Sequence, residues 1–295
     1  MPTNLCLRIL IAAILLTSCV SQPAVTQVNA QPTNETASAP LPTETSTEAP
    51  TSKSLTPTDL TVFAAASLTA AFGEIGTRFE AAHSGVTVVF NFAGSQQLAQ
   101  QIKEGARADV FASANQIQME ALIAAGEVAG GAQQIFAMNR LVVIYPNDTP
   151  GRVMELKDLA KPGLKLVLAA KEVPVGQYSL DFLDKASAEP AFDTTFKAEA
   201  LNNVVSYEDT VKAVLAKVAL GEADAGIVYV SDISGADAGK VKWIDIPDAL
   251  NVIAVYPIAP VVESQQPELA QAFISLVLSQ AGQDILAKYN FIPMK

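Results

Sequence analysis

The chain has 295 residues and a mass of 31.0 kDa, of which 50% are apolar and 17% charged; that is enough to bury a core in one large domain or two lobes. Its 19 basic and 30 acidic side chains give a net charge of −11, which excludes a general nucleic-acid binder, because such a protein needs a basic face to displace counterions. A single histidine, His83, and two cysteines, Cys6 and Cys19, cannot assemble a His/Cys metal cluster.

The first 19 residues have the pattern of a bacterial export signal. Arg8 precedes an apolar run over 9–16, which is short for a bilayer span but typical of a signal-peptide core. The sequence LTSC follows directly and resembles a bacterial lipobox, in which cleavage leaves a cysteine that carries lipid. We therefore predict a lipoprotein signal peptide over 1–19 with the lipid on Cys19; the alternative is an ordinary secretory signal with an incidental cysteine. Cys6 would be lost on cleavage, so no disulfide is expected.

Residues 20–58 are rich in Thr, Ser, Pro, Ala and Glu and show no sustained apolar periodicity. Such a segment cannot bury enough surface to offset the entropy of ordering it. We predict a disordered tether that holds a folded domain away from a membrane. Residues 1–58 contain only two basic and three acidic side chains, so nearly all of the excess acidity belongs to residues 59–295.

Apolar runs typical of strands alternate with amphipathic helical patterns from residue 59 to the end. This alternation predicts an α/β architecture with largely parallel sheets. The predicted strands cover 60–65, 86–92, 109–112, 141–145, 165–169, 204–206, 225–230 and 241–245. The predicted helices cover 68–82, 96–104, 117–125, 177–186, 209–220, 267–278 and 280–288.

Four turns in which a helix begins after a predicted strand or loop have chemistry suited to binding an anion. In an open α/β sheet, ligands gather at the carboxyl ends of strands, where the next helix starts. The first amides of a helix lack partners and the helix dipole is positive there, so these positions attract anions. Ordinary capping by Ser or Asp explains any one of these turns alone. The four turns are 64–68, 92–96, 173–176 and 207–211.

Several sequence strings closely resemble the molybdate-binding proteins of ABC importers. They are LTVFAAASL at 60–68, NFAGS at 91–95, ADVFASA at 108–114 and GIVYVSD at 226–232, with support from VPVG at 173–176. The resemblance runs from about residue 60 to 291. It implies a type II periplasmic-binding-protein fold, in which two α/β lobes are joined by two crossovers and hold an oxyanion between them. The lobes would comprise 59–138, with 249–295 returning to it, and 139–248.

The resemblance also implies five molybdate contacts in this chain. Two serines would give a hydroxyl and an amide, two valines only an amide, and a tyrosine its phenolic O–H: Ser67, Ser95, Val175, Val211 and Tyr229. The segment 208–211 has room for one extra residue relative to some relatives, so Thr210 is the alternative to Val211. By itself, Tyr229 could equally be a core tyrosine.

The chemistry of molybdate agrees with such a site. Near neutral pH it is a fully deprotonated dianion that needs hydrogen-bond donors and no acceptor, and neutral hydroxyls and amides provide these in fixed directions. A protonated phosphate would also require an acceptor such as a carboxylate. Asp209 is close enough in sequence to be one, but we expect it to cap a helix instead.

These observations predict an extracytoplasmic receptor that captures molybdate, and tungstate as well, and delivers it to a membrane ABC permease. It would be a lipid-anchored monomer, with no cofactor and no enzymatic activity. A receptor for sulfate or another oxyanion is the alternative within the same class. A cell-surface hydrolase using Ser67 would need His83 as its base, 16 residues further on, and the chain has no G-x-S-x-G elbow. A purely structural lipoprotein would not need four donor-rich turns.

The lipid anchor is testable on the chain itself. Cys19→Ala should release the protein from membranes or block its processing, because the alanine offers no thiol to acylate. Membrane fractionation and mass spectrometry of the mature N-terminus check this. A mature N-terminus without lipid, at another residue, would contradict the prediction.

Overall fold

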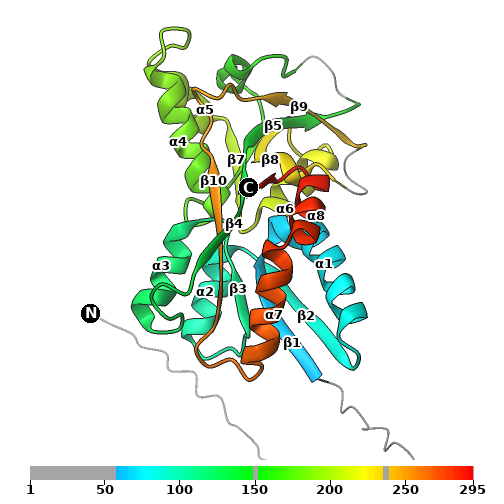
Figure 1. Cartoon of the computed structure of the whole chain (residues 1–295). Coiled ribbons are helices and arrows are strands. Elements are labelled where there is room, and N and C mark those ends of the chain that lie inside the picture. Colours follow the sequence, from blue (N-terminus) through cyan, green and yellow to red (C-terminus); the bar gives the residue numbers. More distant parts are fainter. Residues whose placement is uncertain (1–57, 149–151, 235–238, 295) are drawn as a thin grey trace, which may run out of the picture. The chain divides into compact units, whose positions relative to one another are not determined.

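The computed structural model describes residues 58–148, 152–234 and 239–294. The predicted signal peptide over 1–19, and all but the last residue of the predicted tether, lie outside the described residues. Within the described residues, no helix is both long enough and apolar enough to span a membrane. The strands form two sheets, and helices pack against each of them (Figure 1).

The first sheet has six strands in the order β11-β4-β10-β3-β1-β2. Its strands are β1 (Thr58–Ala65), β2 (Val86–Ala93), β3 (Val110–Ala112), β4 (Gln134–Asn139), β10 (Ala254–Pro260) and β11 (Ile292–Pro293). A short 3-10 turn, η1 (Ala66–Leu68), leads from β1 into α1 (Thr69–Ala82). The other helices that pack on this sheet are α2 (Ser95–Lys103), α3 (Gln116–Ala125), α7 (Pro267–Leu278) and α8 (Gln280–Lys288).

Apolar side chains pack under helices on both faces of this sheet. On one, α1 packs its apolar stripe beside α7, and the Phe273 ring of α7 lies 5.8 Å from Phe72 and 5.5 Å from Phe79, measured between ring centroids. On the other, α2 and α3 cover a separate apolar cluster that includes Phe111 and Leu98. Because both faces are covered, β1 and β3 read as nearly continuous apolar runs.

The second sheet has five strands in the order β7-β6-β8-β5-β9. They are β5 (Leu141–Pro146), β6 (Leu166–Ala169), β7 (Val204–Glu208), β8 (Ala225–Tyr229) and β9 (Val241–Asp245). The helical segments in this part of the chain are η2 (Leu156–Ala160), α4 (Pro174–Ala188), α5 (Phe196–Asn202), α6 (Val211–Ala219) and η3 (Val230–Asp232).

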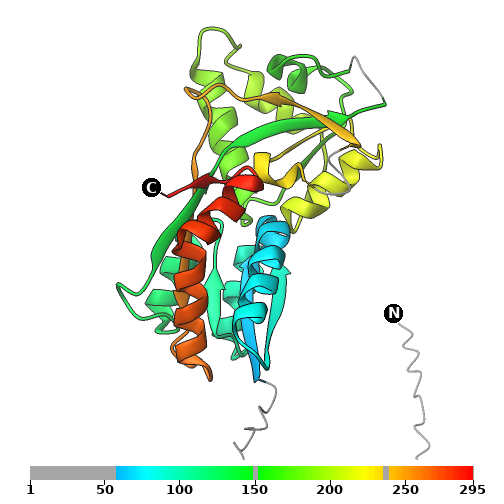
Figure 2. The ribbon, with the colours of Figure 1, turned by 45° about the vertical axis from the view of Figure 1, so that its right-hand side comes forward.

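Two strand connections link the sheets. Arg140 alone separates β4 from β5, so the chain passes almost straight from the first sheet into the second (Figure 2). The return runs from β9 through residues 246–253 into β10. Both connections run directly between strands of the two sheets, which holds the carboxyl ends of one sheet near those of the other.

The prediction of largely parallel sheets is wrong, because both sheets are mixed. β1 pairs in parallel with β2 and β3, and β6 with β7 and β8. The strands next to the two connections, β4, β5 and β10, pair antiparallel with their neighbours. A strand that enters a sheet from the other sheet runs against the strands of the local β-α-β units, and the apolar pattern of the sequence does not reveal this direction.

The sequence pattern also missed β4, β10, β11 and α5. β10 is an interior strand of the first sheet although it contains Pro257 and Pro260, residues that ordinarily argue against an interior strand. The register shifts at the first of these prolines: Tyr256 pairs with Ala137 and Pro257 with Ile135, so Phe136 of β4 is the residue left out of the ladder at this bulge.

Asp109 ties the first sheet to the segment that enters α7. Its Oδ1 accepts hydrogen bonds from the Ser264 hydroxyl at 2.7 Å and from the amides of Gln265 and Gln266 at 3.0 and 3.1 Å. Its Oδ2 accepts the amide of Thr61 at 2.8 Å. One buried carboxylate therefore holds β1 and β3 and satisfies amides just before α7.

Asp109→Ala should lower the free energy of unfolding by about 2–4 kcal/mol, because it removes four charge-assisted hydrogen bonds and leaves donors without acceptors. Urea denaturation measures the change. The matched control is Asp193→Ala, which removes an exposed carboxylate and should change stability by no more than about 0.5 kcal/mol. Equal effects of the two substitutions would refute the role given to Asp109.

Candidate functional site

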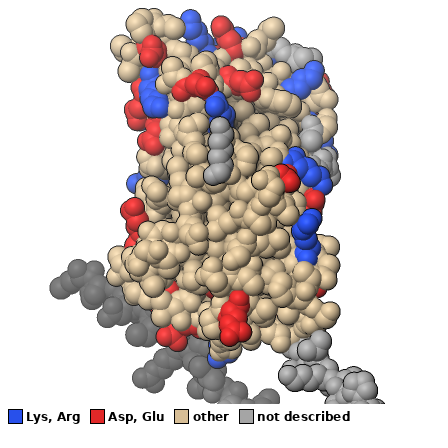
Figure 3. Space-filling view, viewed as in Figure 1, with Lys and Arg blue, Asp and Glu red and all other residues tan. Residues whose placement is uncertain are grey.

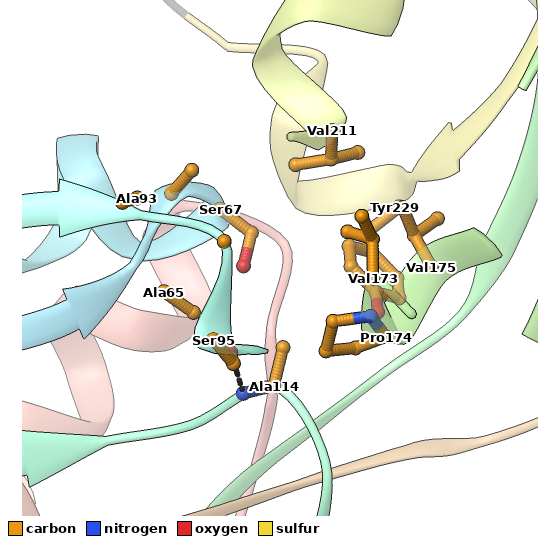
Figure 4. Close-up of a pocket in the computed structure, with 12 residues that line it drawn as sticks. Ala65, Ser67, Ala93, Ser95, Ala114, Val173, Pro174, Val175, Val211 and Tyr229 are labelled. Carbon is orange, nitrogen blue, oxygen red and sulfur yellow. Dashed lines mark hydrogen bonds between the residues drawn. The ribbon is translucent and has the colours of Figure 1, made fainter. Parts of the chain in front are cut away.

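A small pocket lies where strands of both sheets end and the following helices begin. Twelve residues line it, and all five predicted contacts are among them. Ser67 and Ser95 face it from the first sheet, and Val175, Val211 and Tyr229 from the second (Figure 4). Its accessible volume of about 10 Å³ is close to the least space that holds a water molecule. A pocket this small favours a compact ligand.

Ser67 lies in η1, the turn between β1 and α1, and is 3% exposed. The strand ends in a run of alanines, and Ala65 and Ala66 also line the pocket. Their small side chains let the backbone of the turn reach the pocket wall. The hydroxyl of Ser67 is 3.0 Å from the hydroxyl of Tyr256.

Ser95 is the first residue of α2 and is 1% exposed. Its Oγ accepts the amide of Ala114 at 3.0 Å (Figure 4). A hydroxyl that accepts this bond still has its own proton to donate. Ser95 therefore presents both an O–H and a first-turn amide at the pocket.

At Gly94, the residue before Ser95, the start of α2 comes close to the segment just before α6. A Cβ on Gly94 would lie 2.7 Å from the carbonyl oxygen of Asp209, just before α6. Gln96 bridges the same gap, since its Nε2 donates to that carbonyl at 3.2 Å. Position 94 must lack a side chain for α2 and α6 to begin this close together.

Val175 contributes through its backbone at the start of α4. Pro174 occupies the first turn, where its missing N–H costs nothing. A Cβ on Gly176 would lie 2.0 Å from the carbonyl oxygen of Ala170, so the helix start packs directly against the end of β6. The amide of Val175 is one of the first-turn amides without an intrahelical partner.

The alternative between Thr210 and Val211 concerns the start of α6. Val211 lines the pocket, whereas Thr210 is the N-cap and its hydroxyl accepts the amide of Ala213 at 3.2 Å. The expectation that Asp209 caps this helix is therefore wrong, because Thr210 satisfies that amide instead. The side chain of Asp209 is exposed, and only its carbonyl takes part in the contact with Gln96.

Tyr229 ends β8 and is 1% exposed. Its hydroxyl has no hydrogen-bond partner among the described residues, although a buried tyrosine O–H usually finds one. Burial raises the pKa of Tyr229 well above its ordinary value, so the phenol keeps its proton and remains a donor. An unsatisfied donor at the wall of a pocket indicates a ligand that accepts hydrogen bonds.

An ion pair with one buried partner, Asp232, lies behind this wall. Asp232 is fully buried; its Oδ2 accepts the amide of Tyr229 at 3.2 Å and its Oδ1 is 3.0 Å from the ammonium of Lys212, the residue after Val211. Burial raises the pKa of Asp232, and Lys212 opposes that rise. The pair joins the end of β8 to the start of α6, and so positions Tyr229 relative to Val211.

The pocket itself carries no ionised side chain. None of its lining residues, within the part of the chain that the structure describes, is Asp, Glu, His, Lys or Arg. The described residues also contain no cluster of His, Cys, Asp and Glu that could hold a metal ion. On the face shown in Figure 3, acidic and basic side chains are interspersed and form no continuous basic surface. The site can therefore bind an anion only through neutral donors.

The structure separates the two residues of the hydrolase hypothesis. Ser67 precedes α1, and His83 follows its last residue, so a helix about 20 Å long lies between them. The His83 ring stacks on Phe79, with 4.0 Å between centroids, and its Nδ1 is 2.9 Å from the Phe79 carbonyl oxygen. His83 therefore cannot act as a base for Ser67 in this conformation.

Sequence reasoning missed the residues that hold the serines in place. The amide of Ala114 contacts Ser95, and Tyr256 contacts Ser67. The string ADVFASA includes Ala114, so that residue stood within a recognised motif. No signal pointed to Tyr256, because its strand was not predicted.

Comparisons with known proteins identify the family of the chain. Residues 60–292 match the family of bacterial extracellular solute-binding proteins. The chain is 40% identical over 232 residues to the molybdate-binding protein ModA of Mycobacterium tuberculosis, covering 79% of this chain and 84% of that one.

Two solved structures share the fold. The periplasmic molybdate-binding protein of Azotobacter vinelandii matches with a TM-score of 0.69 at 22% identity, over 80% of this chain and 100% of that one. The sulfate-binding protein SubI of Mycobacterium tuberculosis matches with a TM-score of 0.72 at 19% identity, over 81% and 88%. At these identities the likeness establishes the fold, a type II periplasmic-binding-protein architecture of two α/β lobes. The chain belongs to the bacterial extracellular solute-binding proteins and, among them, to the family of the molybdate-binding proteins.

Proposed function

We propose that this protein captures molybdate, and tungstate with it, outside the cytoplasmic membrane and delivers it to an ABC permease. The unpartnered hydroxyl of Tyr229, opposite the hydroxyls of Ser67 and Ser95, carries the proposal. The M. tuberculosis relative is named for molybdate binding, and the small pocket suits a compact oxyanion. The role is one of binding and release, without a chemical step.

In this proposal Ser67 and Ser95 each give an O–H and an amide, Val175 and Val211 give amides, and Tyr229 gives its phenolic proton. All of these groups donate, which matches a dianion with no proton of its own. The overall charge of −11 repels anions at long range. Screening weakens that repulsion beyond about 8–10 Å, so donors at contact decide binding.

The proposal also includes where the protein acts and how it is attached to the membrane. A lipid on Cys19 would anchor the chain, and the tether over 20–58 would let the two lobes, 59–138 with 249–295 and 139–248, reach the permease as a monomer. Support for the anchor comes from the LTSC string after an apolar run. Support for the location comes from the family, whose members are extracellular solute-binding proteins.

Isothermal titration of residues 58–295 with molybdate, tungstate, sulfate and phosphate tests the ligand. Molybdate and tungstate should bind at least about tenfold more tightly than sulfate, because a cavity set for the larger tetrahedron stretches charge-assisted bonds to the smaller one. Phosphate should bind weakly, since no lining side chain is a carboxylate that would accept its proton. Equal affinity for sulfate and molybdate would favour the sulfate-receptor alternative.

Substitutions at the pocket test the contacts. Ser95→Ala and Tyr229→Phe each remove one hydroxyl bond to a dianion, worth about 1.5–3 kcal/mol, so each should weaken molybdate binding about tenfold to a hundredfold. Val175→Ala is the matched control, because alanine keeps the backbone amide and should change affinity far less. Titration of each variant, after thermal unfolding shows that it is folded, checks the prediction. Parent-like binding by both hydroxyl variants would show that the assigned contacts are wrong.

A further inference from the structure

A chain of buried polar groups leads to Ser67 from outside the pocket. The side-chain Nδ2 of Asn139 donates to the Ser231 hydroxyl at 2.7 Å and to the Tyr256 hydroxyl at 3.4 Å. The Tyr256 hydroxyl lies 3.0 Å from Ser67 Oγ. The four side chains are between 0% and 3% exposed. Neither Asn139 nor Tyr256 lines the pocket.

The orientation of Asn139 is set by the backbone. Its Oδ1 accepts the amide of Arg140 at 2.9 Å, so its Nδ2 must face Tyr256 and Ser231. An amide NH₂ group can only donate. Asn139 is the last residue of β4, at the first connection between the sheets, so the orienting bond lies within the strand path itself.

The direction of the next bond follows. Tyr256 receives a hydrogen bond from Asn139, and burial keeps its pKa well above the ordinary value, so it retains its proton. Either hydroxyl of the Tyr256–Ser67 bond can be the donor; because Tyr256 already accepts from Asn139, its own proton is free to be donated to Ser67 Oγ. If Ser67 donated to Tyr256 instead, the Tyr256 hydroxyl would accept two hydrogen bonds and Ser67 would have no proton left for the pocket.

We propose that Tyr256 is a positioning residue that turns the Ser67 hydroxyl into a donor toward the pocket, through the chain Asn139 to Tyr256 to Ser67. With its lone pair occupied by Tyr256, Ser67 directs its own proton at the ligand. The chain thus selects for an anion that only accepts hydrogen bonds. This inference rests on the proposed function, because that function supplies a fully deprotonated oxyanion, which accepts the Ser67 proton.

A double-mutant cycle separates this role from a purely structural one. Tyr256→Phe should weaken binding of sodium molybdate about threefold to tenfold, the range for one hydrogen bond. In a Ser67→Ala background the same substitution should change affinity less than twofold, because the group through which Tyr256 acts is absent. A loss of packing alone would cost the same in both backgrounds.

The matched control is Tyr289→Phe. It also removes a hydrogen-bonded phenol, since the Tyr289 hydroxyl donates to Glu74 at 2.9 Å, but this bond lies between α1 and the end of α8 rather than at the pocket. It should leave affinity unchanged in both backgrounds. Thermal unfolding of every variant establishes that the compared proteins are folded.

The outcomes distinguish the two proposals. If the unsubstituted protein binds sulfate rather than molybdate, the molybdate assignment fails, and the cycle is run with sulfate, which is also a fully deprotonated dianion. If it binds neither, the proposed function and this inference fail together. If it binds one of them, and Tyr256→Phe has no effect or has the same effect in the parent and in the Ser67→Ala background, only the inference is overturned.

Discussion

The pocket depends on one constraint: neutral donors from two different sheets must converge on a single small volume. A helix start supplies amides without partners, but the amides of a single helix start are commonly satisfied by an ordinary capping side chain. Here the turns that carry Ser67 and Ser95 face those that carry Val175 and Val211. The two strand connections, at Arg140 and over 246–253, hold the carboxyl ends of both sheets at this point.

The helix starts can approach one another at the pocket only because the residues between them are small. Gly94 permits α2 to approach the carbonyl of Asp209, and Gly176 permits α4 to sit on the end of β6. Ala65 and Ala114 keep the strand ends close to the pocket. Larger side chains at these places would separate the helix starts, and the amides would then face water instead of a shared ligand.

A site built only from neutral donors can also discriminate between different anions. A lysine or arginine would attract any anion of suitable charge, whereas fixed O–H and N–H groups discriminate by geometry and by protonation. The charges behind the Tyr229 wall are paired: Asp232 bonds the amide of Tyr229 and lies 3.0 Å from Lys212. The pair fixes the end of β8 against the start of α6 without placing a free charge in the pocket.

The sequence by itself determined the α/β class, most of the helices and all five lining residues that the family resemblance implied. It could do so because four of those residues stand in recognisable local strings, and Val211 follows from its spacing to the string GIVY. Only the tertiary structure decided the mixed pairing of the sheets, the N-cap at Thr210 and the contact between Tyr256 and Ser67. The last of these joins residues that are 189 positions apart in the chain. No local periodicity records which distant strand lies beside another, so the direction of the Ser67 hydroxyl follows from the placement of β1 and β10 in one sheet, not from any motif.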